Sequence, residues 1–171
     1  MRLLLAIAPE RFRDEELDTP KRAFEEAGIS VDIASTTTGR CTGMLGATAE
    51  AVMTFDGVDP DDYAGVVVVG GAGSQDHLWG NKRLSALVRA FFEQGKVVAA
   101  ICLAPVVLAR AGILAGRQAT VYRSPAAIRE MEKGGANLLE IPVVADMQIV
   151  TANGPGAAAQ FADTIITKLE C

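Results

Sequence analysis

The chain has 171 residues, enough to bury one full hydrophobic core, so we expect a single domain over residues 1–171. Its net charge of −5 argues against broad nucleic-acid binding, which needs a basic surface. No apolar run is long enough to span a membrane. The chain opens directly on a strand-like run without a cleavage-site pattern, so we expect a cytoplasmic protein with no membrane partner.

Cysteine and histidine usage narrows the possible chemistry. The three cysteines, Cys41, Cys102 and Cys171, are an odd number without CxxC spacing, so neither a disulfide framework nor a zinc site is expected. His77 is the single histidine, and a histidine-dependent reaction must use it or borrow a histidine from another chain. We therefore expect no bound metal and no cofactor.

Strand-like apolar runs alternate with amphipathic stretches of helical length along the chain. In chain order we predict a strand at 2–8, a helix at 15–27, strands at 31–34 and 66–69, a helix at 81–94, a strand at 97–101, a helix at 104–111, a strand at 118–122, a helix at 125–133, strands at 142–145 and 148–151, and a helix at 157–169. Pro20 predicts a kink or a later start in the first helix. Residues 36–54 have no helical period and are predicted to form a loop with a short hairpin.

The order of these elements predicts the fold class. Alternating strands and helices imply a mainly parallel sheet with helices on both faces, which is an α/β flavodoxin-like three-layer sandwich. The continuous apolar run VVVV at 66–69, ended by Gly70 and Gly71, is typical of a strand covered on both faces. The last two strands are predicted to pair across a turn at Asp146 and Met147.

Cys102 follows the apolar strand 97–101 directly, with Ala100 and Ala104 two residues away on either side. A nucleophile elbow needs small residues at those places because its strained turn brings neighbouring backbone close. The thiol is then expected at a helix N-terminus, which favours the thiolate, at the carboxyl end of a strand. The Leu103 amide is expected to point toward an oxyanion. From the local sequence alone, a buried structural cysteine is the alternative.

These motifs and their spacing resemble the ThiJ/PfpI superfamily of class I glutamine amidotransferase-like proteins. That superfamily includes the PfpI-type intracellular peptidases and the human parkinsonism-associated deglycase. The resemblance covers nearly the whole chain and implies a nucleophilic role for Cys102. It rests on Glu16-Leu17 with Pro20, Thr54-Phe55-Asp56, Val68-Val69-Gly70-Gly71, Ala100-Ile101-Cys102, the stretch from Gly116-Arg117 to Tyr122, and Gly154-Pro155-Gly156.

The resemblance also implies partners for the cysteine. Glu16 matches the family's carboxylate that sits against the nucleophile and can carry its proton, and burial there should raise the pKa of this carboxyl. Without the resemblance, Glu16 would be read as a solvated helix charge. The Gly71 amide would be the second oxyanion donor beside that of Leu103.

The chain departs from the peptidase pattern at two positions. PfpI-type peptidases carry a histidine directly after the nucleophile and a glutamate shortly after the double glycine, whereas Leu103 and Gln75 stand here. Amide hydrolysis by a Cys-His-Glu constellation is therefore disfavoured. The deglycase-type branch has a histidine near the strand that here reads Thr120 to Arg123, and Tyr122 matches the peptidase-type tyrosine instead.

His77 is the remaining candidate base, in a predicted loop after the double glycine, with Asp76 available to orient it. The alternative is a surface-loop histidine. Trp79 is interpreted as a packing or interface residue, Cys41 as structural, and Cys171 as a mobile terminal residue. Three arginines are candidates for contact with an anionic substrate, with a plain surface charge as the alternative: Arg13, Arg40 and Arg123.

Three function hypotheses follow. In the first, the Cys102 thiolate adds to a small carbonyl such as methylglyoxal in a glyoxalase III-like or deglycase-like enzyme, with a peptidase or amidase as its variant. In the second, Cys102 serves a non-catalytic redox sensor or chaperone by oxidation to sulfenic and sulfinic acid. A flavin protein is disfavoured because residues 8–11 offer few phosphate-binding groups. The resemblance implies a homodimer or a higher homo-oligomer.

Overall fold

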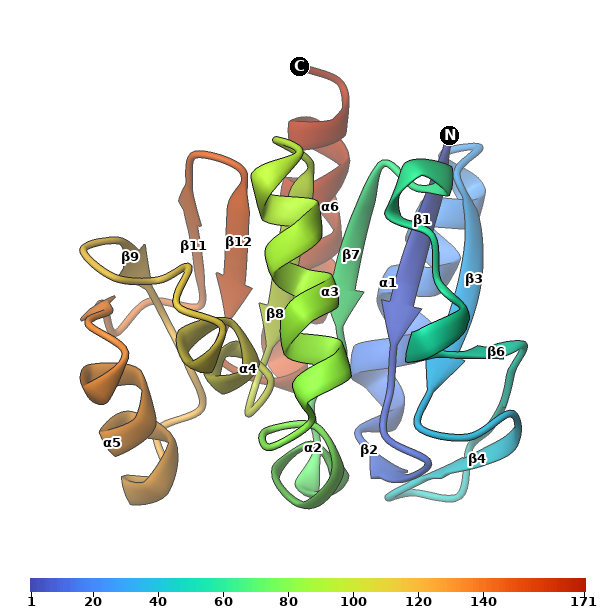
Figure 1. The fold of residues 1–171 in the computed structure, drawn as a ribbon, viewed down its shortest axis with the longest axis horizontal. Coiled ribbons are helices and arrows are strands. Elements are labelled where there is room, and N and C mark those ends of the chain that lie inside the picture. Colours follow the sequence, from blue (N-terminus) through green and yellow to red (C-terminus); the bar gives the residue numbers. More distant parts are fainter.

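A computed structural model describes all 171 residues and contains a seven-stranded sheet (Figure 1). The strands lie in the order β11-β12-β8-β7-β1-β3-β6, and every neighbouring pair is parallel except β11 with β12. Their bounds are Arg2–Ala6 (β1), Ser30–Ser35 (β3), Met53–Thr54 (β6), Gly65–Val68 (β7), Val97–Ile101 (β8), Val143–Asp146 (β11) and Ile149–Ala152 (β12). The mainly parallel sheet and its antiparallel edge are as predicted.

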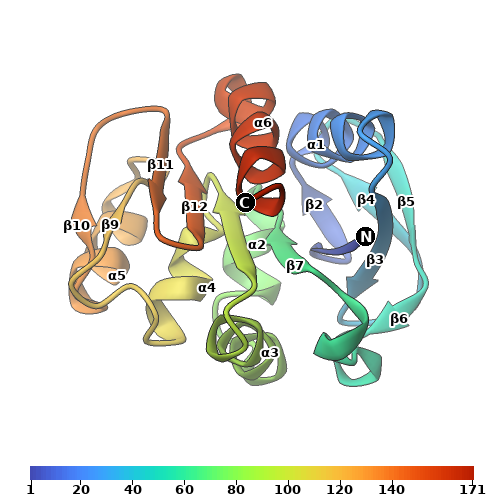
Figure 2. The same ribbon diagram turned by 90° about the horizontal axis from the view of Figure 1, so that it is seen from above.

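Helices cover both faces of the sheet (Figure 2). On one face α1, Asp14–Glu26, packs beside α6, Ala158–Leu169. On the other face lie α3, α4 and α5, with the short α2 at the carboxyl ends of the strands; their bounds are Ala72–His77 (α2), Lys82–Glu93 (α3), Pro105–Arg110 (α4) and Pro125–Lys133 (α5). The predicted flavodoxin-like three-layer sandwich is confirmed.

The core consists of two apolar clusters, one on each face of the sheet. Successive residues of β7 alternate between them, because side chains along a strand point to opposite faces: Val66 and Val68 join one cluster and Val67 joins the other. Both faces are therefore apolar, and this accounts for the uninterrupted apolar signal of the buried strands.

The predicted hairpin within residues 36–54 is present in a small second sheet. Its strands are β4, Gly39–Gly43, and β5, Thr48–Ala51, which pair antiparallel, and β4 also pairs with β2, Glu10–Phe12, an element that the sequence pattern did not predict. A two-stranded sheet joins β9, Gln118–Ala119, to β10, Asn137–Leu138, and three short 3₁₀ turns span Phe55–Gly57, Pro60–Asp62 and Pro155–Ala157.

Three local predictions need correction. The helix containing Pro20 begins at Asp14, so its late start is wrong. The strand predicted at 118–122 ends at Ala119, because the backbone N–H of Thr120 donates to the Thr151 hydroxyl and the chain leaves the ladder. The predicted loop after the double glycine is the helix α2. No helix of the structure has the length and apolar character needed to cross a membrane.

Candidate active site

Cys102 occupies a strained turn between β8 and α4. Its backbone φ is +65°, in the left-handed region that residues other than glycine seldom adopt. Its N–H donates to the Ala152 carbonyl at 2.8 Å, and its carbonyl accepts from the Tyr122 N–H at 2.8 Å. Such a conformation costs about 1–3 kcal/mol and persists only where the surroundings fix it. The two neighbouring segments hold the elbow in place.

Gly70 lies beside both Cys102 and Glu16, two residues after β7 ends. A Cβ atom at Gly70 would come within 2.6 Å of Glu16 Oε1 and 2.7 Å of Cys102 Cβ. The Gly70 carbonyl accepts from the Arg13 N–H at 2.9 Å, which ties the start of α1 to this point. The ends of β7 and β8 and the first turn of α1 therefore meet here, and no side chain fits at Gly70 beside the acid and the elbow.

Glu16 is completely buried, with 0% of its surface exposed. Neither carboxyl oxygen has a hydrogen-bond partner of good geometry, although the Cys102 thiol and the Gly70 amide are close enough to influence the group. Burial raises the pKa of Glu16 to about 8, and the nearby thiol, the Arg13 guanidinium and the Gly70 amide oppose this rise only in part. Glu16 is therefore largely protonated at neutral pH.

The Cys102 thiol is 7% exposed, and its pKa contradicts the expected thiolate. Burial, and then the charge and hydrogen bonding of Glu16, raise the pKa of Cys102 to about 12, while the Gly71 and Leu103 amides oppose the rise. The short helix α4, with six residues, and the two amides lower the pKa of the thiol less than burial and the neighbouring acid raise it. The two groups are coupled, because the charge of Glu16 raises the pKa of Cys102, so the loss of one proton from the pair opposes the loss of the second.

A cavity of about 240 Å³ opens at Cys102. It is smaller than the ~300–1,000 Å³ of pockets for drug-sized ligands, which suits a small molecule. Larger depressions elsewhere on the surface do not include the cysteine; one of about 510 Å³ contains Gln75 and Trp79. Besides Cys102 and Gly71, the cavity is lined by Arg13, Met44, Ala72, Leu103, Tyr122 and Pro155.

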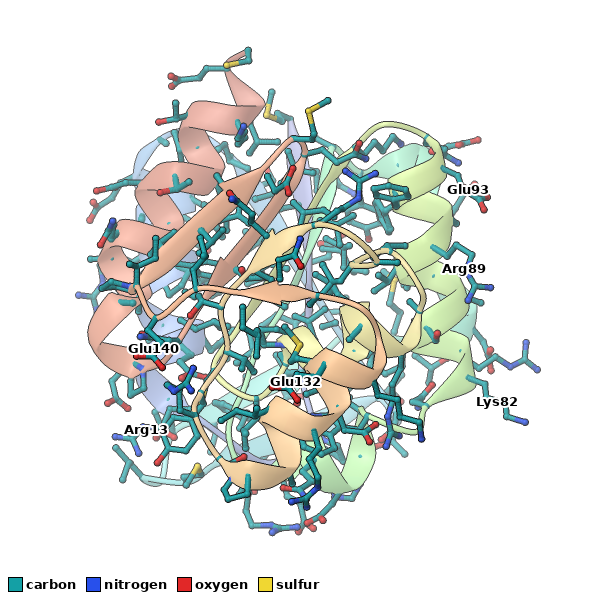
Figure 3. All side chains as sticks on the ribbon, turned by 90° about the vertical axis from the view of Figure 1, so that its left-hand side faces the viewer. Arg13, Lys82, Arg89, Glu93, Glu132 and Glu140 are labelled. Carbon is teal, nitrogen blue, oxygen red and sulfur yellow. The ribbon has the colours of Figure 1, made fainter.

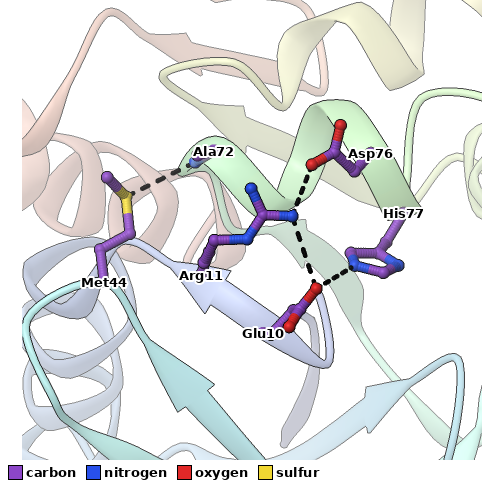
Figure 4. A network of polar contacts seen from close by, with 6 residues as sticks. All are labelled: Glu10, Arg11, Met44, Ala72, Asp76 and His77. Atoms are coloured by element: carbon purple, nitrogen blue, oxygen red, sulfur yellow. Dashed lines mark hydrogen bonds and ion pairs between the residues drawn. The ribbon is translucent and has the colours of Figure 1, made fainter.

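His77 does not lie beside Cys102. It ends α2, where its Nε2 lies 3.2 Å from Glu10 Oε1, and it is absent from the cavity lining (Figure 4). Asp76, predicted to orient it, pairs instead with Arg11 Nη2 at 2.5 Å. The prediction missed this arrangement because it depends on β2 lying beside α2. In this structure His77 has no contact through which to act as the base.

The three candidate arginines differ in their placement. Arg13 lines the cavity. Its guanidinium is paired with Glu15, to which Nε and Nη2 each donate a hydrogen bond at 3.0 Å. Figure 3 shows Arg13 on the opposite side of the molecule from the exposed residues of α3. Arg123 pairs with Glu140 at 3.0 Å, and neither it nor Arg40 lines the cavity.

The remaining residues behave as follows. Trp79 is buried and its Nε1 donates to the Leu103 carbonyl at 2.8 Å, which confirms a packing role. Cys41 is buried, Cys171 is exposed, and all three cysteines are free. Met44 lines the cavity but was not predicted to do so, because the position of its hairpin is set by tertiary contacts that leave no local pattern.

Replacing Glu16 with glutamine is expected to stabilise the protein more as pH rises from about 4.5 to about 8. The folded wild type holds the Glu16 proton across this window and the unfolded chain does not, so its free energy of unfolding falls by up to about 1.4 kcal/mol per pH unit. Glutamine has no proton to lose. Thermal unfolding of both proteins across this range measures the difference, and a gap that shrinks with rising pH would contradict the assignment.

The fold and this site define a class of α/β protein with a cysteine elbow, two backbone donors and a buried acid. The DJ-1/PfpI family model matches residues 1–168, and the chain belongs to that family.

Comparison with similar proteins supports this family membership. The chain is 48% identical over 169 residues to an uncharacterized protein of Methanocaldococcus jannaschii, covering 99% of this chain and 82% of that one. It is 35% identical over 154 residues to a deglycase of Thermococcus kodakarensis, covering 90% of each. A ThiJ/PfpI domain protein from Brachyspira murdochii superposes with a TM-score of 0.95 at 33% identity, covering 99% of this chain and 96% of that one.

Proposed function

We propose that this protein is a cysteine-dependent enzyme that acts on small reactive carbonyl compounds, as a glyoxalase III-like or deglycase-like catalyst. One observation carries the proposal: Cys102 shares a small cavity with the Gly71 and Leu103 amides and is backed by the protonated, fully buried Glu16. A nucleophile, two oxyanion donors and an acid are the groups that carbonyl addition needs. The relative named a deglycase supports the same class of reaction.

The reactive form is the pair that has lost one proton, in which Glu16 is the carboxylate and Cys102 is still a thiol. As the sulfur attacks, Glu16 takes the thiol proton, so that the charge passes to sulfur and the proton to Glu16. The Cys102 sulfur adds to the aldehyde carbon of an α-oxoaldehyde, forming a C–S bond, and the carbonyl electron pair moves to oxygen. The Gly71 and Leu103 N–H groups stabilise this oxyanion. Glu16 then gives it a proton, which leaves a neutral hemithioacetal and a Glu16 carboxylate.

That carboxylate supplies the base for the second half of the reaction. It takes the proton from the former aldehyde carbon, giving an enediolate. The hydroxyl proton on that carbon then passes to the neighbouring oxygen, and Glu16 returns its proton to the neighbouring carbon. Methylglyoxal becomes a lactate thioester in this way, and water hydrolyses the thioester to lactate and restores the thiol. An aminocarbinol would give the same hemithioacetal by loss of its amine, so a deglycase reaction shares this intermediate.

Peptide hydrolysis fits the site less well. An amide needs a proton delivered to its leaving nitrogen, and a histidine usually supplies it. Leu103 follows the nucleophile, Gln75 lies in a different depression, and His77 is held by Glu10. No histidine is therefore available beside Cys102 for that step.

A redox-sensing role is the second candidate, and the unpartnered Glu16 oxygens favour it. A protonated carboxyl beside the sulfur could donate a hydrogen bond to a sulfinate oxygen. The raised pKa of Cys102 disfavours the redox-sensing role, since the thiolate is the form that oxidises. Peptide mass spectrometry after dilute hydrogen peroxide separates the roles: selective sulfinate at Cys102 without any aldehyde turnover supports the sensor.

The enzyme proposal predicts lactate formation when the purified protein is incubated with methylglyoxal. Alkylation mapped to Cys102 by peptide mass spectrometry should abolish this activity, because the sulfur can no longer form the adduct. A Cys41→Ala variant treated in the same way shows whether the other buried cysteine contributes. Lactate no faster than in buffer alone, or full activity after complete alkylation of Cys102, would contradict the proposal.

A further inference from the structure

The tip of the β4–β5 hairpin lies at the mouth of the cavity. The Met44 N–H donates to the Phe12 carbonyl at 2.8 Å, which fixes the tip against β2. Across the hairpin, the Gly43 N–H donates to the Ala47 carbonyl at 2.8 Å. Met44 is therefore held by its backbone while its side chain lines the cavity.

Asp14 holds this tip from the other side. It is the first residue of α1 and is only 7% exposed. Its Oδ1 accepts from the Leu45 N–H at 3.1 Å and its Oδ2 accepts from the Ala47 N–H at 2.8 Å. An acid at the start of a helix usually accepts hydrogen bonds from the free N–H groups of that helix, whereas both oxygens of Asp14 accept from N–H groups of the hairpin. Gly43 packs so closely on Asp14 that any side chain at Gly43 would overlap the carboxylate.

The Met44 side chain reaches from the hairpin to the oxyanion side of the cavity. Its sulfur lies 3.5 Å from the N–H of Ala72, the residue directly after the oxyanion donor Gly71 (Figure 4). It is 43% exposed, so Met44 lines the cavity and also faces solvent. Its neighbour Leu45 is 65% exposed and does not line the cavity, which makes it a matched control.

We propose that Met44, seated by Asp14, is the specificity-determining residue that limits this site to compact carbonyl substrates with a small apolar substituent. Apart from Arg13, whose guanidinium is paired with Glu15, the other large side chains that line the cavity are largely apolar and match such a substituent: Leu103, Tyr122 and Pro155. Asp14 is a positioning residue that acts through Met44. The identity of the substrate rests on the proposed function, whereas the size limit concerns access to Cys102.

The size limit is tested by alkylating Cys102 with N-methylmaleimide and N-phenylmaleimide, which react by the same addition and differ in bulk. Peptide mass spectrometry follows the Cys102 peptide alone. Met44→Ala is expected to raise the phenyl-to-methyl rate ratio about tenfold over wild type. Leu45→Ala should leave the ratio unchanged. A ratio unaltered in Met44→Ala, or raised equally in Leu45→Ala, overturns the proposal.

The role of Asp14 is tested in a double-mutant cycle with the same ratio. Asp14→Asn keeps the side-chain volume but turns an amide N–H toward one of the hairpin N–H groups, so it loosens the tip. It should raise the ratio in the wild-type background and add nothing in the Met44→Ala background. Effects that simply add would show that Asp14 does not act through Met44.

Steady-state turnover tests the size limit independently of alkylation. Met44→Ala is expected to raise kcat/KM for phenylglyoxal relative to methylglyoxal about tenfold. The maleimide ratios need no turnover, so a raised ratio without any lactate formation contradicts the proposed function and leaves the size limit standing. Lactate formation with unchanged ratios contradicts the size limit alone.

Discussion

Replacing Cys102 with alanine is expected to lower kcat/KM for methylglyoxal by about 10⁴–10⁶-fold, the loss typical of removing a nucleophile from a covalent mechanism. Without sulfur no hemithioacetal forms, and the Gly71 and Leu103 amides can only polarise a bound carbonyl. Alanine fits the space of the thiol. Steady-state lactate formation by the two proteins measures the loss.

Cys41→Ala is the control for this substitution. Cys41 is also buried and free, yet it lies in the β4 strand and does not line the cavity. Its variant should keep wild-type kcat/KM. Activity of Cys102→Ala within about tenfold of wild type would mean that catalysis does not proceed through a covalent adduct on this residue.

Glu16→Gln is expected to lower kcat/KM by about 10²–10⁴-fold, the usual contribution of a positioned acid–base group. The wild-type rate should rise with pH and level off above about 8, because the reactive pair forms when its first proton leaves. In the variant this inflection should disappear. The pKa of Cys102 should also fall below its wild-type value of about 12, since the charge of Glu16 is gone.

The neighbouring Glu15→Gln variant is the matched control. The charge of Glu15 contributes to the raised pKa of Glu16, so its removal should move the inflection to lower pH while the inflection itself persists. Profiles of kcat/KM against pH for the three proteins test both statements. An inflection near the wild-type pH in Glu16→Gln would assign that titration to another group.

The fold was largely predictable because its central strands are buried on both faces. The run VVAAI at Val97–Ile101 has no polar interruption, and its predicted bounds match β8. The helix α2 was missed because its six residues, Ala-Gly-Ser-Gln-Asp-His, form no apolar stripe. The strand before Tyr122 was overextended because its end is set by a hydrogen bond to the Thr151 hydroxyl, far away in the sequence.

The site was predictable where its signals are local. Alanine spacing around Cys102 indicated the elbow, and the resemblance indicated Glu16. The direction of the pKa shift at Cys102 was not predictable, because burial of the thiol depends on how the first turn of α1 and the end of β7 close over it. The distance between His77 and the thiol likewise depends on tertiary placement, since Glu10 holds the ring from β2.

The absence of a side chain at Gly70 has a consequence for anyone who wishes to transplant this chemistry. The close approach of Glu16 and Cys102 depends on bare main chain beside them, because a Cβ atom at Gly70 would come within 2.7 Å of both residues. Copying Cys102 and Glu16 onto another scaffold would therefore reproduce the two groups without their separation. A designer would have to graft the end of β7 as a third component.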